Sequence, residues 1–141
     1  MVRRVGDVMT SEPQALPLHA TLYEAARVMR DKGIGDVLVT DGERLCGMVT
    51  DRDIVVRAVA ERRNTVFTSL AEVCTAELAV LGPDDDTDTA VRLMREHAVR
   101  RLPVVDGGHR PIGIVTAGDL MLAGLDGPGP LPEISKAPPG L

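Results

Sequence analysis

An internal repeat constrains the fold of this chain more than any other feature. The segment GMVTDRDI at residues 47–54 recurs as GIVTAGDL at residues 113–120. A stretch with helical periodicity precedes each copy, at residues 22–30 and 87–95. A V-x-T tripeptide stands further upstream in both copies, at residues 8–10 and 73–75. Self-similarity with a period of about 65 residues indicates two copies of one supersecondary unit that bury their apolar faces together.

The composition limits what these two copies can bind. With 141 residues and 44% hydrophobic content, the chain can form one compact domain or two small units that share a core. Its only aromatic residues are Tyr23 and Phe67, so the core must be aliphatic. The net charge of −5 argues against nucleic acid, which requires an excess of Lys and Arg. The shortage of aromatic rings argues against single-strand binding by base stacking.

The sequence also indicates the compartment. It contains no run of 18 apolar residues, so we expect no membrane-spanning segment and no membrane partner. The N-terminal residues lack the apolar core of a signal peptide. The two cysteines are then expected to be free thiols in a reducing compartment. These observations predict a cytoplasmic protein.

The first copy predicts the order strand, helix, strand, strand, helix. Thr21 and Glu24 form a capping-box pattern ahead of an apolar stripe with helical spacing. Asp41 and Gly42 stand between two aliphatic runs, a pattern typical of a β-hairpin. The predicted elements are a strand at 14–16, a helix from 22 that ends at Gly33 and Gly35, strands at 36–40 and 45–50, and a helix from 51 to about 62.

The second copy predicts the same order. Asp86 is the expected cap of a helix whose apolar face is Thr87, Ala90, Val91 and Met94. The other predicted elements are a short strand at 79–81, a hairpin of strands at 102–105 and 111–116, and a helix from 117 to about 125. We place the domain boundaries at 1–65 and 66–125. Residues 126–141 are rich in Pro and Gly and form a predicted tail.

The closing helix of each copy carries more apolar surface than one contact requires. Aliphatic residues occupy most positions of 54–60 and of 120–125. A helix that is apolar on several sides is buried on several sides. In a chain of this size, we expect a second copy of the chain to cover part of this surface. The pattern therefore predicts a homodimer.

These features together closely resemble the CBS domain. The resemblance rests on the β-α-β-β-α order, the strand ending G-h-h-T-x-x-D (h, aliphatic), and the run RRLPVVD at residues 100–106. It extends from about residue 5 to residue 125 and occurs twice in register, as in stand-alone bacterial two-CBS proteins. The resemblance implies an α+β fold, a CBS-domain pair (Bateman module) with pseudo-twofold symmetry and sheets flanked by helices. It also implies two clefts for adenosyl ligands and pairing of modules into a disc.

The T-x-x-D pairs are the strongest candidates for ligand contacts. A threonine that ends a strand places its hydroxyl and the following N–H groups at a positive helix N-terminus, which suits phosphate. The aspartate three residues later can accept hydrogen bonds from the vicinal hydroxyls of a ribose. The resemblance assigns these roles to Thr50 with Asp53 and to Thr116 with Asp119. The structural alternative is that each pair is a helix-capping box.

The two clefts are not expected to be equal. Arg100 and Arg101 precede the second hairpin, where Gly35 and Asp36 precede the first. Arginine can hold a phosphate through a bidentate fork, whereas a carboxylate repels it, so we favour the second copy as the nucleotide site. The alternative is that both arginines lie on a solvated or ion-paired surface. The candidate ligand contacts are Thr10, Thr50, Arg52, Asp53, Thr75, Val99, Arg100, Arg101, Pro103, Thr116 and Asp119.

Gly47 and Gly113 stand just before the two T-x-x-D motifs. A glycine inside a strand allows a ligand or another strand to approach the backbone closely. The pattern leaves open which of the two approaches here.

Other reactive residues do not form a recognisable site. The spacing of His19, His97 and His109 matches no metal site. The acidic run at residues 84–88 lacks the central Gly and terminal Glu of a calcium loop. Cys46 and Cys74 are expected to be small core residues rather than a redox pair. No nucleophile set or phosphate-binding Gly-rich loop is evident, so we expect no enzymatic activity.

Two classes of function remain open. The first is a regulatory module that senses AMP, ADP, ATP, S-adenosylmethionine or NAD, needs no fixed cofactor, and acts on an unknown regulated protein. A ligand can do this only if its affinity differs between two arrangements of the module. The second is a ligand-independent interaction or stress-response scaffold. The T-x-x-D pairs favour the first class.

Overall fold

The computed structural model describes residues 3–124, which form two compact units. The first unit comprises residues 14–78, and the second unit comprises residues 3–13 together with residues 79–124. The units therefore do not follow the repeat boundaries. The V-x-T segment of each copy belongs to the unit built around the other copy.

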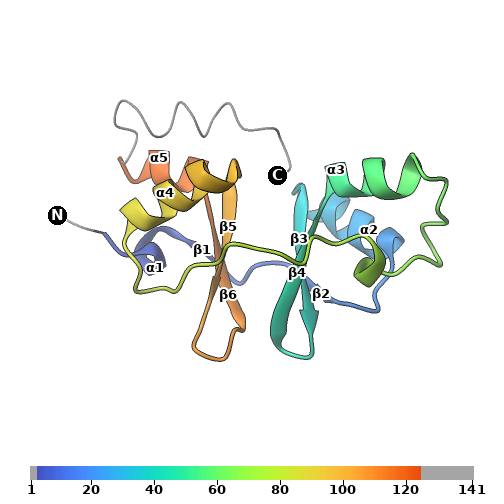
Figure 1. Ribbon diagram of the computed structural model, residues 1–141, viewed down its shortest axis with the longest axis horizontal. Helices are drawn as coiled ribbons and strands as arrows, with labels where there is room; N and C mark the ends of the chain where they lie inside the picture. Colours follow the sequence, from blue (N-terminus) through green and yellow to red (C-terminus); the bar gives the residue numbers. More distant parts are fainter. Residues whose placement is uncertain (1–2, 125–141) are drawn as a thin grey trace. The chain divides into compact units, whose positions relative to one another are not determined.

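The first unit contains a three-stranded sheet of order β2-β3-β4 (Figure 1). Strand β2 runs parallel to β3, and β4 runs antiparallel to it. Its elements are β2 (Ala15–Pro17), α2 (Leu22–Lys32), β3 (Asp36–Asp41), β4 (Arg44–Thr50), α3 (Asp51–Ile54), the π-helix η1 (Val55–Val59) and the 3-10 helix η2 (Leu70–Glu72).

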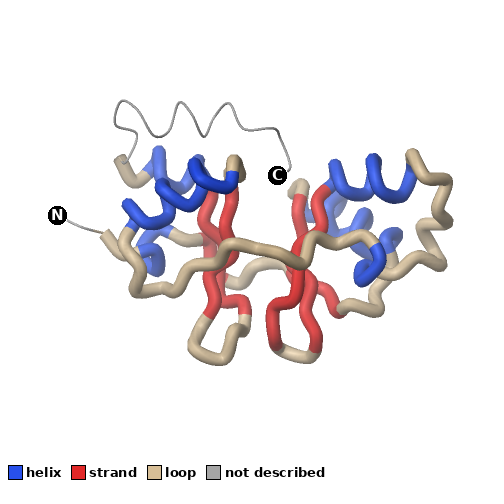
Figure 2. The backbone as a smooth tube through the Cα atoms, in the orientation of Figure 1, coloured by secondary structure: helices blue, strands red, loops and turns tan. Residues whose placement is uncertain are grey.

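The second unit contains a three-stranded sheet of order β1-β6-β5, with both pairs antiparallel. In each unit the helices pack on one side of the sheet (Figure 2). The elements of the second unit are α1 (Val5–Val8), β1 (Thr10–Ser11), α4 (Thr87–His97), β5 (Arg101–Val105), β6 (Pro111–Thr116) and α5 (Ala117–Leu122). No helix within residues 3–124 is long and apolar enough to cross a lipid bilayer.

Local sequence patterns predicted the long helices and the hairpins correctly. The Thr21 hydroxyl accepts a hydrogen bond from the Glu24 backbone N–H at 3.2 Å, and the Glu24 carboxylate accepts one from Thr21 N–H at 3.1 Å. Helix α2 ends at Gly33, which has a φ of 66°. Helix α4 begins after Asp86, whose carboxylate accepts from Thr89 N–H at 2.8 Å. The predicted apolar face of α4 is buried.

The predicted strand at 79–81 was wrong. In the first unit, Leu38 N–H donates to Gln14 O at 2.9 Å and extends the ladder between β2 and β3. Pro103 occupies the position of Leu38 in the second unit and has no N–H to donate. Only an isolated bridge between Leu81 and Val104 remains, made by the bonds Leu81 N–H to Pro103 O and Val105 N–H to Leu81 O.

The helix predicted from 51 to about 62 is shorter and less regular. Helix α3 ends at Ile54, and the chain continues as the π-helix η1, with Ala60 N–H bonded to Val55 O five residues earlier. The β-branched valines of this segment lower its α-helical propensity. Helix α5 ends at Leu122 rather than near 125. The predicted tail, 126–141, lies outside the described residues.

Each unit has its own aliphatic core beneath its helices. The first core includes Leu22, Val37, Val49 and Leu70, all fully buried, together with other small and aliphatic side chains. The second core is centred on Leu81, Met94, Leu102 and Leu120, with Val5 of α1 among them. Each core therefore holds the strand end that carries a T-x-x-D motif against two helices.

Gly47 and Gly113 each allow the V-x-T segment of the same unit to approach, rather than a ligand. A Cβ at Gly47 would lie 2.9 Å from Cys74 Sγ and 3.0 Å from Thr75 O. A Cβ at Gly113 would overlap the Met9 side chain and lie 3.0 Å from the carbonyl oxygen of the next residue. These distances are too short for an unstrained contact.

Replacing either glycine with alanine is therefore expected to lower the free energy of unfolding by about 1–3 kcal/mol, as overpacking does elsewhere. Urea denaturation of Gly47→Ala and Gly113→Ala measures this effect. Gly107→Ala is the matched control, because a Cβ there meets no atom within 4 Å. Identical midpoints for the three variants would contradict the packing argument.

Candidate functional site

In both units the T-x-x-D motif forms a reciprocal helix cap. The Thr50 hydroxyl accepts from Asp53 N–H at 3.1 Å, and Asp53 Oδ2 accepts from Thr50 N–H at 3.0 Å. Thr116 and Asp119 form the same two bonds, both at 3.0 Å. The capping-box interpretation is therefore correct for both motifs. Each cap uses only the Oδ2 atom of its aspartate. The Oδ1 atom can therefore accept a hydrogen bond from another partner.

The V-x-T segment of each copy pairs with the motif strand of the other copy, and we call these the exchanged segments. Each one brings a second threonine to a motif strand. Thr75 and Met48 form two mutual backbone hydrogen bonds, at 3.0 Å and 2.9 Å. Thr10 lies opposite Ile114 in the β1-β6 ladder. Both partners stand two residues before a motif threonine. Each candidate site thus combines residues from both copies of the repeat, which the linear order of the sequence did not reveal.

The residues that face the motif threonines across each hairpin differ in charge. The register places Asp36 opposite Thr50 and Arg101 opposite Thr116. The preceding residues are also equivalent, because Gly35 O accepts from Asp51 N–H at 2.9 Å and Arg100 O accepts from Ala117 N–H at 2.8 Å. One candidate site is thus bordered by a carboxylate and the other by a guanidinium.

Three further predicted ligand contacts are Arg52, Val99 and Pro103. Arg52 is exposed on the first turn of α3, and its backbone N–H donates to Asp51 Oδ1 at 2.8 Å. Val99 is half-buried and packs against the second core. Pro103 is buried within β5, where it pairs with Ile114. The last two therefore contribute chiefly to packing in this structure.

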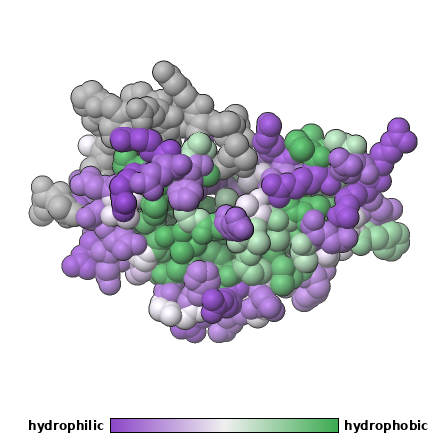
Figure 3. Space-filling view, in the orientation of Figure 1, coloured by the Kyte–Doolittle hydropathy of each residue, from purple (hydrophilic) through white to green (hydrophobic). Residues whose placement is uncertain are grey.

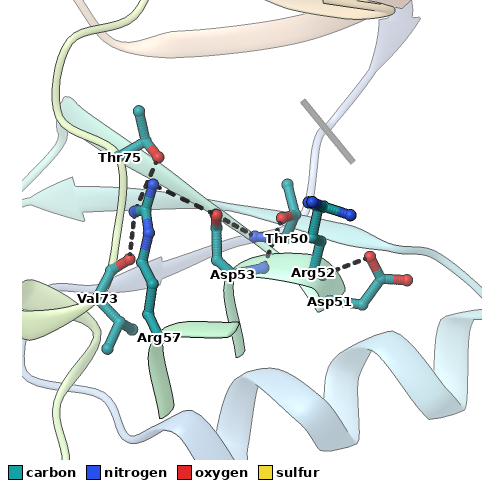
Figure 4. A network of polar contacts seen from close by, with 7 residues as sticks. All are labelled: Thr50, Asp51, Arg52, Asp53, Arg57, Val73 and Thr75. Atoms are coloured by element: carbon teal, nitrogen blue, oxygen red, sulfur yellow. Dashed lines mark hydrogen bonds and ion pairs between the residues drawn. The ribbon is translucent and has the colours of Figure 1, made fainter. Parts of the chain in front are cut away.

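Arg57 is a candidate site residue that the sequence analysis missed. Its Nη1 donates to Val73 O at 2.9 Å and to Thr75 Oγ1 at 3.1 Å, and its Nη2 lies 3.7 Å from Asp53 Oδ1 (Figure 4). Arg57 follows Asp53 by four residues, the spacing of an ion pair on one helix face. That spacing is the sequence signal for the pair, although Arg57 lies within the apolar run at residues 54–60.

The two motif aspartates consequently differ in surroundings. The Asp53 side chain is only 8% exposed and has Arg57 beside its free oxygen. Asp119 is half-buried, and within residues 3–124 it forms no ion pair. Ala123 occupies the position equivalent to Arg57 in the second unit. The free oxygen of Asp119 is therefore the more available hydrogen-bond acceptor.

The cysteines lie against the first core. Burial raises the pKa of the Cys46 thiol, and it also raises the pKa of the Cys74 thiol. Cys46 Sγ donates a weak hydrogen bond to Val39 O at 3.3 Å. Both groups therefore remain protonated and weakly nucleophilic at neutral pH. Among the described residues, no three His, Cys, Asp or Glu side chains are grouped closely enough to hold a metal ion.

An open hollow of about 510 Å³ lies elsewhere on the first unit, between α2 and β2. It contains none of the predicted ligand contacts. Its lining residues are Leu16, Pro17, His19, Ala20, Glu24, Arg27, Val28 and Asp31. This hollow is separate from the T-x-x-D motif of the same unit.

Comparison with known proteins identifies the family. The CBS domain model matches residues 5–59 and 70–126. The CBS domain-containing protein YhcV of Bacillus subtilis is 38% identical over 116 residues, which cover 82% of this chain and 81% of YhcV. Hypoxic response protein 1 of Mycobacterium tuberculosis is 34% identical over 115 residues, which cover 81% of this chain and 80% of that protein.

Solved structures agree with these matches. The crystal structure of hypoxic response protein 1 with two coordinated zinc ions has a TM-score of 0.78 at 31% identity, covering 86% of this chain and 98% of that one. The CBS domain pair of protein MJ0100 in complex with 5′-methylthioadenosine and S-adenosyl-L-methionine has a TM-score of 0.78 at 24% identity, covering 87% of this chain and 96% of that one. On its sequence, its fold and its two T-x-x-D motifs, this chain belongs to the CBS domain family, as a tandem pair.

Proposed function

We propose that this protein is a non-catalytic regulatory module that binds an adenosyl ligand through its second unit. The observation that carries this proposal is the state of Asp119. Its Oδ2 is held by the helix cap, while its Oδ1 has no cationic partner among the described residues and the side chain is half-buried. A fixed, partly desolvated carboxylate oxygen is a good acceptor for a ribose hydroxyl.

The neighbouring residues support the same assignment. Thr10 on β1 and Arg101 on β5 lie opposite residues on the two sides of β6, the strand that ends in Thr116. The hydroxyl and the guanidinium suit the polar and phosphate groups of a nucleotide. The ligands of the MJ0100 domain pair, 5′-methylthioadenosine and S-adenosyl-L-methionine, also carry an adenosine group. We therefore include AMP, ADP, ATP, NAD and these two compounds as candidates.

We further propose that the functional protein is a homodimer in the cytoplasm. Val55, Val56 and Val59 are 57%, 50% and 59% exposed on the α3–η1 helix, and Leu122 on α5 is 92% exposed. Hydrophobic surface is visible over α3 and η1 in Figure 3. Exposed apolar side chains clustered on one helix mark an interaction surface. A second copy of the same chain offers the matching surface.

A thermal-shift screen tests ligand binding. A ligand at 100 times its dissociation constant is expected to stabilise the native state by about 2.7 kcal/mol, which raises the melting temperature by several degrees. The screen compares the adenosyl compounds with cytidine monophosphate as the control. No shift with any adenosyl compound would overturn the proposal and favour the alternative, an interaction scaffold that needs no ligand.

A further inference from the structure

Arg57 is one of the charged residues by which the two T-x-x-D sites differ, in addition to Asp36 and Arg101, which face the motif threonines. Both sites have the same cap, the same hairpin and a second threonine from the exchanged segment. The first site alone has an arginine seven residues after its motif threonine. The second has Ala123 at that position. The two sites of one chain can therefore be compared at this position, where the residue is arginine in one unit and alanine in the other.

Arg57 engages both groups that a ligand would use in the first unit. It lies beside Asp53 Oδ1, the carboxylate oxygen that the helix cap leaves available. It also donates to Thr75 Oγ1 at 3.1 Å, which occupies an acceptor position of that hydroxyl. Figure 4 shows the guanidinium between the motif and the segment that contains Val73 and Thr75.

The remaining bond of Arg57 explains why the guanidinium stays in this place. Its Nη1 donates to Val73 O at 2.9 Å, so the side chain is tied to the backbone as well as to two side chains. The Arg57 side chain is 45% exposed, whereas that of Asp53 is 8% exposed. A partly exposed guanidinium therefore lies beside a carboxylate that is almost fully buried. A ribose diol must displace the guanidinium to reach Asp53.

We infer that Arg57 is the specificity-determining residue that closes the first unit to ribose diols and confines adenosyl binding to the second unit. This inference rests on the proposed function. Arg57 acts as a competing internal ligand. Its ion pair with Asp53 and its hydrogen bond to Thr75 must break before a diol can bind. The protein then takes up one adenosyl ligand per chain rather than two.

A phosphate-binding role for Arg57 is the opposing physical possibility. A half-exposed guanidinium attracts anions, and Arg57 would then strengthen nucleotide binding in the first unit. The geometry favours the role in which Arg57 blocks ligand binding in the first unit. All three contacts of its guanidinium are with the protein's own oxygen atoms. The two roles predict opposite effects of removing the side chain, which makes them distinguishable.

Reciprocal substitutions test the inference by titration calorimetry with AMP and with S-adenosyl-L-methionine. Arg57→Ala is expected to raise the stoichiometry from one ligand per chain toward two. Ala123→Arg is expected to weaken the site of the second unit by about tenfold, the change that corresponds to 1.4 kcal/mol. Titration of Arg57→Ala with 2′,3′-dideoxy-AMP, which has no diol, is expected to show much weaker binding than AMP in both units, because neither aspartate then has a ribose hydroxyl to accept from.

Arg63→Ala is the matched control. Like Arg57, Arg63 is a partly exposed arginine of the first unit. Its Nη2 forms an ion pair with Oε1 of Glu72 in η2 at 3.4 Å, and it forms no ion pair with Asp53. This variant is expected to keep one ligand per chain. Circular dichroism and thermal melting of all variants verify that the fold is retained.

The outcomes separate the inference from the proposed function. One ligand per wild-type chain and an unchanged stoichiometry in Arg57→Ala would overturn the inference and leave the proposed function standing. Two ligands per wild-type chain, or loss of binding in Arg57→Ala, would also overturn the inference. Absence of binding in both the wild type and Arg57→Ala would overturn the proposed function and the inference together.

Discussion

Asp119→Ala is expected to weaken adenosyl binding by on the order of 1.5–3 kcal/mol, through loss of charge-assisted hydrogen bonds to the ribose. This corresponds to a roughly 10- to 150-fold increase in the dissociation constant. Asp119 also closes a helix cap, since its Oδ2 accepts from Thr116 N–H. Asp119→Asn is therefore needed beside the alanine variant, because its side-chain oxygen retains the cap but loses the charge. Titration calorimetry measures both.

Asp53→Ala is the internal comparison for this prediction. It removes the same capping bond in the first unit, where Asp36 faces Thr50 across the hairpin and Arg57 forms an ion pair with the carboxylate. We expect a much smaller loss of affinity than for Asp119→Ala. We also expect Asp36→Arg to improve anion binding in the first unit. Equal losses for the two aspartate variants would contradict the preference for the second unit.

Charge at the exposed apolar helix surface is expected to abolish dimerisation. Val55→Asp places a carboxylate on the apolar helix surface of the first unit, and Leu122→Asp places one on α5 of the second unit. If these helices form the dimer interface, each variant buries an unpaired charge, which costs far more than losing a methyl contact. Sedimentation at micromolar concentration is expected to give a dimer for the wild type and the 15.0 kDa monomer, or aggregates, for the variants.

Val66→Asp is the control for dimerisation. Val66 is 53% exposed, close to the value for Val55, but it lies outside the α3–η1 helix. This variant is expected to remain dimeric. A wild-type protein that sediments only as a monomer would contradict the dimer proposal, and so would Val55→Asp and Leu122→Asp variants that remain dimers.

The features predicted well from sequence are those specified by neighbouring residues. Thr21 with Glu24, and Asp86 with its following helix, encode helix starts within a few positions. The Asp41-Gly42 turn fixes the first hairpin in the same way. These local signals do not depend on the rest of the fold. The T-x-x-D motifs were likewise recognisable because the repeat presents them twice.

Features that depend on distant pairing were not predicted. The sequence placed Thr10 and Thr75 at the start of their own copies, but backbone pairing joins each of them to the unit of the other copy. No short-range pattern encodes this exchange. The false strand at 79–81 is different, since the missing N–H of Pro103 was visible in the sequence. Recognising it required knowledge of which strands pair.

The central claim is that an adenosyl ligand binds at the Asp119 motif of the second unit. The most direct test is an amide NMR titration with AMP and with S-adenosyl-L-methionine. The largest chemical-shift changes are expected at Thr10, Arg101, Thr116 and Asp119, with little change at Thr50 and Asp53. The strongest changes at Thr50 and Asp53, or no changes with either compound, would contradict the claim.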